Sequence, residues 1–355
     1  MNPRNLLDAF QRWSDQGRDL VLATVFETAG STYSKTGARM LMTADGKFQG
    51  MLSGGCLEGD LASRAQQVSE SGVPQSVTYD LGRDDEELWG LGVGCDGLMR
   101  IFLQPLAAGS GYQPFAAMAA VYAGDEPGVA VTVLESESEL VEAGATLVQA
   151  GAGCTAWGIA ESARLETATC VAESLKRTAS FTRMQDVAGR KVHVLYALLQ
   201  PPPRILLLGG GPDAEPVVRL IAELGWRVIV QDHRPAYIQS GNFEQAEAVL
   251  NEPVAGFGKR MPLSGIDAVI VMSHHLQSDR AYLEWLSSSK VPYVGLLGPI
   301  DRRRRLLDDL GPAASGLAGR VHGPAGMDIG GRGPASIALS IIAEIHEVLA
   351  RRKRI

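Results

Sequence analysis

The chain has 355 residues, of which 45% are apolar and 21% are charged, and its formal net charge is −7. This length and composition predict a globular protein of two domains, and the acidic balance argues against nucleic acid as a main partner. The sequence has no apolar run of transmembrane length and no signal-peptide core, so we expect a cytoplasmic protein that contacts no membrane. Four cysteines without a CxxC pair also favour a reducing compartment.

The first half of the chain predicts an α+β domain. Apolar residues at helical spacing from Leu6 to Trp13 predict a short helix, and a strand is expected over 20–26. Ala44-Asp45-Gly46 between apolar segments is typical of a β-hairpin, with strands over 39–43 and 47–52. Further strands are expected over 76–79, 98–103, 129–134, 145–149 and 192–199. Helical patterns between these strands are weak, so the domain should contain an antiparallel sheet.

A glycine loop with a cysteine follows the predicted hairpin. Ser53-Gly54-Gly55-Cys56 stands directly before a series of apolar residues at helical spacing, namely Leu57, Leu61, Ala65 and Val68. Cys56 is therefore expected at a helix N-terminus, where unpaired backbone N–H groups and the helix dipole favour a thiolate. A thiolate ligates metals and carries sulfur, whereas the alternative is an inert cysteine in the core.

A second glycine loop of the first half covers residues 92–97 and contains Gly94 and Cys95. Its glycines let backbone N–H groups approach a ligand closely, although a sharp turn with a small buried thiol is an equal alternative. The acidic run 84–87 is more typical of a solvated turn than of a metal site. Cys154 and Cys170 lack a comparable setting, so we expect them in the core.

The run Pro201-Pro202-Pro203 predicts a boundary between domains over 1–200 and 201–355. After it, an apolar strand over 204–208 leads into Gly209-Gly210-Gly211, then a helix, then a strand that ends at Asp232. This βαβ pattern predicts a Rossmann-like domain with a doubly wound parallel sheet. Asp213 stands at the helix start, where a dinucleotide pyrophosphate would lie, and this weakens the prediction that NAD binds there.

Three later loops of the second half are further candidates for ligand binding. His274 and His275 follow a strand expected over 268–272, and because they point to opposite sides, at most one faces a site. Gly295 and Gly298 lie in the segment 295–299, at the end of a strand expected over 293–297, and they suggest an anion-binding turn between strand and helix. The basic run 302–305 that follows is more typical of a solvated helix face, with one or two arginines able to reach a phosphate. His322 opens a glycine-rich segment over 322–331, before a last helix that should begin at Pro334.

In combination, these motifs resemble the XdhC/CoxI family, the accessory factors of molybdenum hydroxylases such as xanthine dehydrogenase. The similar segments are spread over nearly the whole chain, at 30–32, 37–40, 53–59, 89–95, 209–211, 226–228, 232–235, 293–298 and 322–330. The chain departs from the family pattern at a few positions, namely Tyr33-Ser34-Lys35, Asp96, His275 and Gly298-Pro299.

The resemblance implies an accessory protein rather than a turnover enzyme. Such a protein binds molybdenum cofactor (molybdopterin), protects it during installation of its sulfido ligand, and delivers it to a molybdenum hydroxylase apoenzyme. The resemblance also implies a homodimer that contacts a cysteine desulfurase. It implies Cys56 and Cys95 as the reactive thiols, with Cys56 as the metal ligand. The expected cofactor-binding positions are Gly54, Gly55, Glu58, Gly94, Gly209, Gly210, Gly211, Asp232, His274, Gly295, Gly298 and His322.

Two other functions use the same residues. An NAD(P)-dependent oxidoreductase with a reactive cysteine is favoured by the Rossmann pattern, but Asp213 and the absence of a proton-relay pair in the sequence near Cys56 disfavour it. A sulfurtransferase would carry persulfide on Cys56 or Cys95, and the sequence does not separate it from a chaperone. The second domain also predicts a place for a nucleotide, and we expect the cofactor to lie between the domains.

Overall fold

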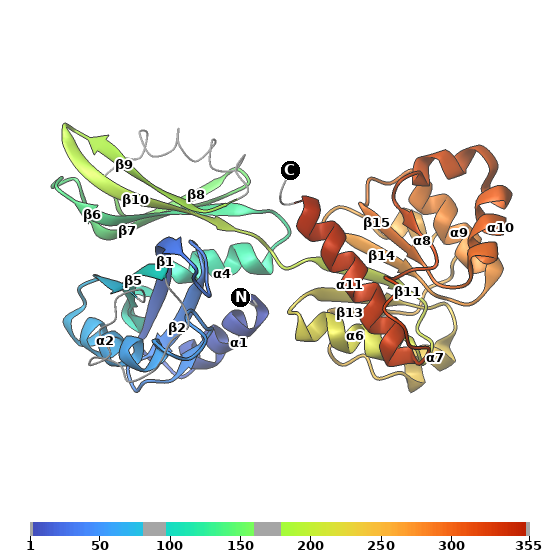
Figure 1. Ribbon diagram of the computed structural model, residues 1–355, viewed down its shortest axis with the longest axis horizontal. Helices are drawn as coiled ribbons and strands as arrows, with labels where there is room; N and C mark the ends of the chain where they lie inside the picture. The colour runs from blue at the N-terminus through green and yellow to red at the C-terminus, as the bar shows by residue number, and fades with distance from the viewer. Residues whose placement is uncertain (1–2, 81–96, 160–178, 353–355) are drawn as a thin grey trace. The chain divides into compact units, whose positions relative to one another are not determined.

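A computed structural model describes residues 3–80, 97–159 and 179–352 of the chain (Figure 1). The chain divides into two compact units, Met1–Pro201 and Pro202–Ile355. The predicted fold class is confirmed, because unit 1 contains antiparallel sheets with helices and unit 2 contains a parallel sheet covered by helices. Gly94, Cys95, the acidic run 84–87 and Cys170 lie outside the described residues.

The first sheet of unit 1 is five-stranded and antiparallel, with the order β3-β2-β1-β5-β4. Its strands are β1 (Leu20–Gly30), β2 (Arg39–Thr43), β3 (Phe48–Gln49), β4 (Gln75–Asp80) and β5 (Gly97–Leu106). Helix α2 (Glu58–Ser71) packs on one face of this sheet, because Leu61 and Val68 lie on one side of the helix and meet Val21 and Ala23 of β1.

The second sheet of unit 1 is also five-stranded, with the order β8-β7-β6-β10-β9. Its strands are β6 (Gly128–Ser136), β7 (Val141–Ala150), β8 (Gly153–Ile159), β9 (Phe181–Val187) and β10 (Arg190–Leu199). Strands β8 and β9 were not predicted, because much of their surface is exposed and their apolar alternation is weak. The expectation that Cys154 belongs to the core is wrong, since Cys154 lies exposed on β8.

Helices α1 (Pro3–Ser14) and α4 (Phe115–Ala123) join the two sheets of unit 1, and a short helix, η1 (Ala108–Ser110), precedes α4 (Figure 1). One core cluster contains Leu6 of α1, Leu22 of β1, Phe115 of α4 and Val148 of β7. We expected only weak helical patterns between the strands of the first half, and this expectation missed helix α4. Its sequence FAAMAAVYA is apolar on all sides and gives no amphipathic period, because sheets cover it from both directions.

Unit 2 is built on a six-stranded parallel sheet with the order β13-β12-β11-β14-β15-β16. Its strands are β11 (Arg204–Leu208), β12 (Arg227–Gln231), β13 (Ala248–Leu250), β14 (Ala268–Val271), β15 (Tyr293–Leu296) and β16 (Val321–His322). From β11, successive strands are added first on one side (β12, β13) and then on the other (β14, β15, β16), so the strand order switches between β11 and β14. In such folds ligands bind at the carboxyl ends of the strands beside that switch point.

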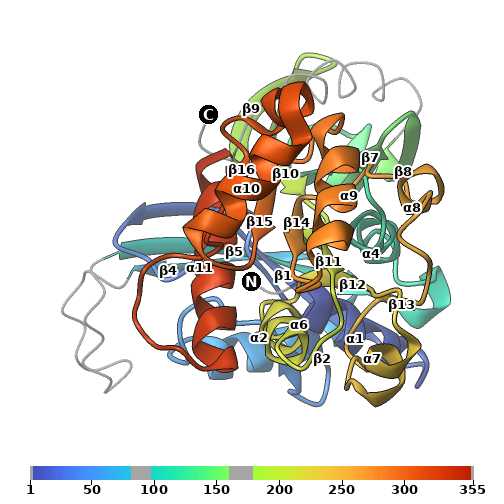
Figure 2. The ribbon, with the colours of Figure 1, turned by 90° about the vertical axis from the view of Figure 1, so that its right-hand side faces the viewer.

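Helices cover both faces of the parallel sheet. Helices α6 (Ala214–Glu223) and α11 (Pro334–Arg352) pack together on one face, where Val217 and Ile341 meet Ile205 and Leu207. Helices α9 (Leu276–Ser287) and α10 (Ile300–Leu310) lie side by side on the other face (Figure 2). Shorter helices complete the unit, namely α7 (Pro235–Ser240), α8 (Phe257–Arg260) and η2 (Gly311–Leu317). None of the helices within the described ranges is long and apolar enough to cross a membrane.

Candidate functional site

The glycine loop before Cys56 is held in shape by the carboxylate of Glu58. Glu58 Oε1 accepts hydrogen bonds from the backbone N–H groups of Leu52 and Ser53, both at 2.9 Å. Oε2 accepts one from Gly55 N at 3.0 Å and one from the Ser53 hydroxyl. The Ser53 hydroxyl oxygen in turn accepts from Leu57 N at 2.8 Å. Both carboxylate oxygens are thus engaged by the loop, so Glu58 shapes the loop rather than offering a free oxygen to a ligand.

The Glu58 carboxylate is charged in this setting. Burial by itself would raise its pKa, since only 2% of the residue is exposed, but hydrogen bonds from Ser53 and Leu52 outweigh that effect and lower the pKa. Glycine is required in the loop because Gly54 and Gly55 have φ angles of 82° and 113°, which other residues rarely adopt.

Cys56 lies directly before Leu57, the N-cap residue of helix α2, so this cysteine stands at the start of the helix as predicted. It is a free cysteine, half-buried, and it packs against the core between α2 and the first sheet. A thiol that is partly exposed and fixed at a helix start is suited to binding a soft metal or to carrying sulfur.

In unit 2, the glycine loop Gly209-Gly210-Gly211 follows β11 at the carboxyl edge of the sheet. Gly209 has a φ of 132°, and a Cβ there would lie 2.4 Å from the carbonyl oxygen of Met272, so only glycine fits. Gly210 N donates a hydrogen bond of 2.8 Å to Asp232 Oδ2. The first two glycines therefore pack the loop against neighbouring strand ends, whereas Gly211 has a common backbone conformation and more space.

Asp232, expected to bind a ribose, is already paired within the protein. Arg234 donates from Nε to Oδ1 at 2.9 Å and from Nη2 to Oδ2 at 2.7 Å, while its backbone N–H also donates to Oδ1. Burial would raise the pKa of Asp232, but the bonds from Arg234 and Gly210 N lower it, so the group is a buried carboxylate. Neither oxygen remains for a ribose hydroxyl without the loss of one of these bonds.

The pair of Arg234 and Asp232 extends to two further loops. Arg234 Nη2 also donates to the carbonyl oxygen of Ser273 at 3.0 Å, and Ser273 Oγ donates to Asp279 Oδ1 at 2.5 Å. The other oxygen of Asp279 accepts from Arg302 Nη2 at 2.7 Å. Sequence reasoning misses this network, because it places Arg234 only within a family motif and assigns Arg302 to a solvated helix face.

The two adjacent histidines have different surroundings, as their opposite directions predicted. His274 is the more exposed, with 58% of its side chain accessible, and its Nε2 lies 2.7 Å from Asp213 Oδ2. His275 caps helix α9, because its Nδ1 accepts a hydrogen bond from Ser278 N. Only His274 is therefore placed to meet a ligand.

The remaining predicted positions of unit 2 lie near β15 and β16. Gly298 has a φ of 123°, and a Cβ there would lie 2.6 Å from Arg302 Cδ, so this glycine leaves room for the arginine. His322 pairs through Nδ1 with Glu344 Oε1 at 2.9 Å and stacks on Tyr293, whose hydroxyl donates to Glu344 Oε2. Gly295 lies beneath the same tyrosine ring. His322 and Gly295 thus belong to a packed cluster with α11.

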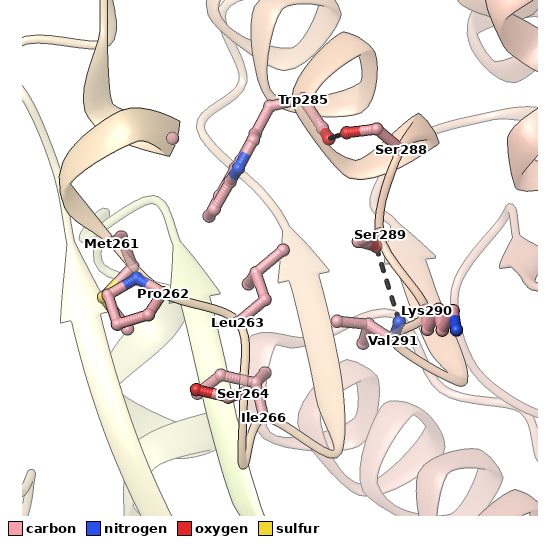
Figure 3. A pocket seen from close by; sticks show the side chains of 11 residues that line it. Met261, Pro262, Leu263, Ser264, Ile266, Trp285, Ser288, Ser289, Lys290 and Val291 are labelled. Carbon is pink, nitrogen blue, oxygen red and sulfur yellow. Dashed lines mark hydrogen bonds between the residues drawn. The ribbon is translucent and has the colours of Figure 1, made fainter.

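A pocket of about 440 Å³ in unit 2 lies at the opposite edge of the sheet from these loops, at the amino ends of β14 and β15. Trp285 projects into it across from Met261 and Leu263, as Figure 3 shows. The pocket contains none of the predicted site residues that the structure describes. The described ranges also contain no group of three or more His, Cys, Asp or Glu side chains that could hold a metal ion.

Comparison with known proteins identifies the family. Residues 205–345 match the XdhC Rossmann domain, and residues 13–80 match the XdhC and CoxI family. A protein of Bacillus subtilis (strain 168), named as a probable xanthine dehydrogenase component, is 30% identical over 354 residues, which cover 100% of this chain and 98% of that protein. The chain belongs to the XdhC and CoxI family.

Two other relatives of this XdhC-family chain match nearly its whole length. A crystal structure of a xanthine dehydrogenase from Bacillus halodurans has a TM-score of 0.78 and 27% identity, covering 99% of this chain and 97% of that one. The Escherichia coli (strain K12) protein PaoD, named a molybdenum cofactor insertion chaperone, is 22% identical over 94% of this chain and 84% of its own length.

Proposed function

We propose that this protein binds molybdenum cofactor as cargo and supports its sulfuration and its insertion into a molybdenum hydroxylase of the xanthine dehydrogenase type. The Cys56 loop carries this proposal. A soft metal and a sulfur-handling step both call for a thiol whose position is fixed before the ligand arrives, and the Glu58 carboxylate fixes this loop. The similarity to PaoD over most of the chain supports the same function.

In this proposal the partners are the hydroxylase apoenzyme and a cysteine desulfurase that supplies the sulfur. The protein would act as a homodimer in the cytoplasm. Co-purification with each candidate partner, and the mass of the protein in solution, test these points separately from cofactor binding.

The decisive experiment is anaerobic purification, followed by metal analysis and by pterin fluorescence after oxidation. We expect molybdenum and pterin close to one per chain. Bound nicotinamide without molybdenum or pterin would instead support the alternative function, an NAD(P)-dependent oxidoreductase with a reactive cysteine.

The strand order of unit 2 favours that alternative, because it creates the crevice that binds dinucleotides in Rossmann folds. The side chains in the crevice oppose it. Asp232 is paired with Arg234, and the carboxylate of Asp213 stands at the start of α6, where a pyrophosphate would bind.

A further inference from the structure

Unit 1 contains a groove of about 710 Å³, and none of its lining residues is one of the predicted site residues. Its walls come from the start of α1, from the loop between β1 and β2, and from residues 49–51. The volume lies in the range of small-molecule binding sites. We name it the Tyr33 groove, after the most exposed large hydrophobic side chain of its wall.

The Tyr33 groove adjoins the Cys56 loop. The ring of Tyr33 lies over Gly54, since a Cβ on that glycine would be 3.5 Å from the ring carbon Cδ2. The Ser34 hydroxyl also donates to the carbonyl oxygen of Met51 at 3.4 Å, which links the two sides of the groove. One side chain, Tyr33, therefore contacts both the groove and the loop that carries the thiol.

The chemistry of the groove favours an anion. Its lining residues include the basic Lys35 and no aspartate or glutamate, although the whole chain has a net charge of −7. Among the described residues, the Lys35 ammonium makes one long side-chain contact, at 3.4 Å from Thr32 Oγ1. In the part of the chain that the structure describes, the backbone N–H groups of Lys35 and Thr36 donate to no protein acceptor. An ammonium group beside free N–H donors is suited to a phosphate.

The same groove presents two apolar groups that suit a flat ring. Tyr33 is 63% exposed and Met51 is 47% exposed, and both line the groove. An exposed phenol ring stacks on planar heterocycles, and a thioether packs favourably against aromatic edges. A ligand that combines a flat heterocycle with a phosphate would satisfy both halves of the groove.

We propose that the Tyr33 groove recognises the phosphorylated pterin part of the cargo, with the pterin ring stacked on Tyr33 and the phosphate at Lys35. This inference rests on the proposed function and adds the place and the chemistry of recognition. The contact between Tyr33 and Gly54 sets the groove beside the Cys56 loop, as a ligand with a flat ring at one end and a thiophilic metal at the other requires.

The test uses the full chain and a metal-free probe, neopterin monophosphate, whose binding is followed by fluorescence anisotropy. We expect Tyr33→Ala and Lys35→Met each to weaken binding about tenfold, because each removes one strong contact. Tyr33→Phe should keep binding within about twofold, since it retains the ring. Lys191→Met and Met184→Ala change exposed side chains of the second sheet and should bind as the wild type does.

Failure of the wild type to bind the probe would overturn the groove assignment, and so would unchanged binding in both Tyr33→Ala and Lys35→Met. The variant Cys56→Ala separates this inference from the proposed function. If Cys56→Ala binds the probe normally and fails to activate the hydroxylase, the groove assignment and the proposed role of the thiol are both supported. If it activates the hydroxylase fully while Tyr33→Ala loses the probe, the groove stands and the role of the thiol fails.

Discussion

His274 Nε2 lies 2.7 Å from Asp213 Oδ2, and this contact holds a carboxylate at the N-terminus of helix α6. In a dinucleotide-binding fold, the pyrophosphate occupies that position. The first glycine loop of unit 2 thus carries an anion of its own, and a ligand phosphate must displace it or bind elsewhere.

Removal of the Asp213 charge should therefore strengthen the binding of a phosphate at this loop. We expect Asp213→Asn to tighten the binding of NADH, measured by calorimetry, about two- to fivefold, the size of a charge effect at a helix N-terminus. Glu223→Gln, at the other end of α6, is the matched control and should change little. Equal or weaker binding in Asp213→Asn would show that this carboxylate does not compete with phosphate.

Gly209 and Gly211 should respond differently to substitution. Gly211→Val should remain folded, because the nearest atom to a Cβ there is Asp213 Oδ1 at 3.1 Å, yet the side chain would fill the approach of a phosphate and abolish nucleotide binding. Gly209→Ala should lose about 1–3 kcal/mol of stability, because its φ is 132° and its Cβ would meet Met272. Thermal unfolding and nucleotide titration of both variants check this. Wild-type affinity in a folded Gly211→Val protein would make the loop purely structural.

Substitution of the thiol tests the proposed function directly. Cys56→Ala should lower cofactor retention, or activation of the hydroxylase, by about tenfold or more, as loss of a group at a metal site does. Its free energy of unfolding should fall by only about 1 kcal/mol, since the residue is half-buried. The control is Cys154→Ala, which removes an exposed thiol on β8 and should change neither property. Full activation by Cys56→Ala refutes the assignment.

The Glu58 carboxylate should make the loop sensitive to acid. Its pKa in the folded protein lies below the ordinary value of 4.5, so the unfolded chain takes up the proton more readily. The contribution of the Glu58 carboxylate to the stability of the folded protein is therefore complete above pH 4.5. It is lost as the pH falls through the lower pKa that Glu58 has in the folded protein.

Glu58→Gln should remove about 2 kcal/mol of stability at neutral pH, because an amide cannot accept from all the donors that the carboxylate satisfies. Its stability should also fall less than that of the wild type as the pH is lowered from neutrality through 4.5 and below, in urea unfolding experiments. Glu70→Gln removes an exposed carboxylate from the same helix and serves as the control. A variant at Glu58 as stable as this control would contradict the role of the carboxylate.

Local sequence patterns were enough to predict much of the fold. The strand expected over 204–208 is β11, and the last helix begins at Pro334 as predicted. Buried parallel strands are short and continuously apolar, and a glycine loop directly follows the strand. The apolar run and the glycine loop can therefore both be recognised from neighbouring residues in the sequence. Helix α4 gave no such signal, because its surroundings rather than its own periodicity make it helical.

The candidate site was only partly predictable for a related reason. The position of Cys56 before a helix follows from neighbouring residues. The pairing of Asp232 with Arg234 and of Asp279 with Arg302 depends on how separate loops meet in space. The contact between Tyr33 and Gly54 likewise joins two loops that no local pattern relates. The sequence therefore predicted the parts of the site that depend on neighbouring residues. It did not predict the parts that depend on contacts between distant segments of the chain.

The apolar helix α4 has a consequence for how unit 1 unfolds. Residues from both antiparallel sheets share one core cluster with it, and the hydroxyl of Tyr122 on α4 accepts a hydrogen bond of 2.7 Å from Arg39 on β2. Neither sheet can detach without exposing the helix to water on that side. The two sheets are thus expected to melt in a single cooperative transition, with hydrogen exchange in β1 and β6 slowed to the same degree.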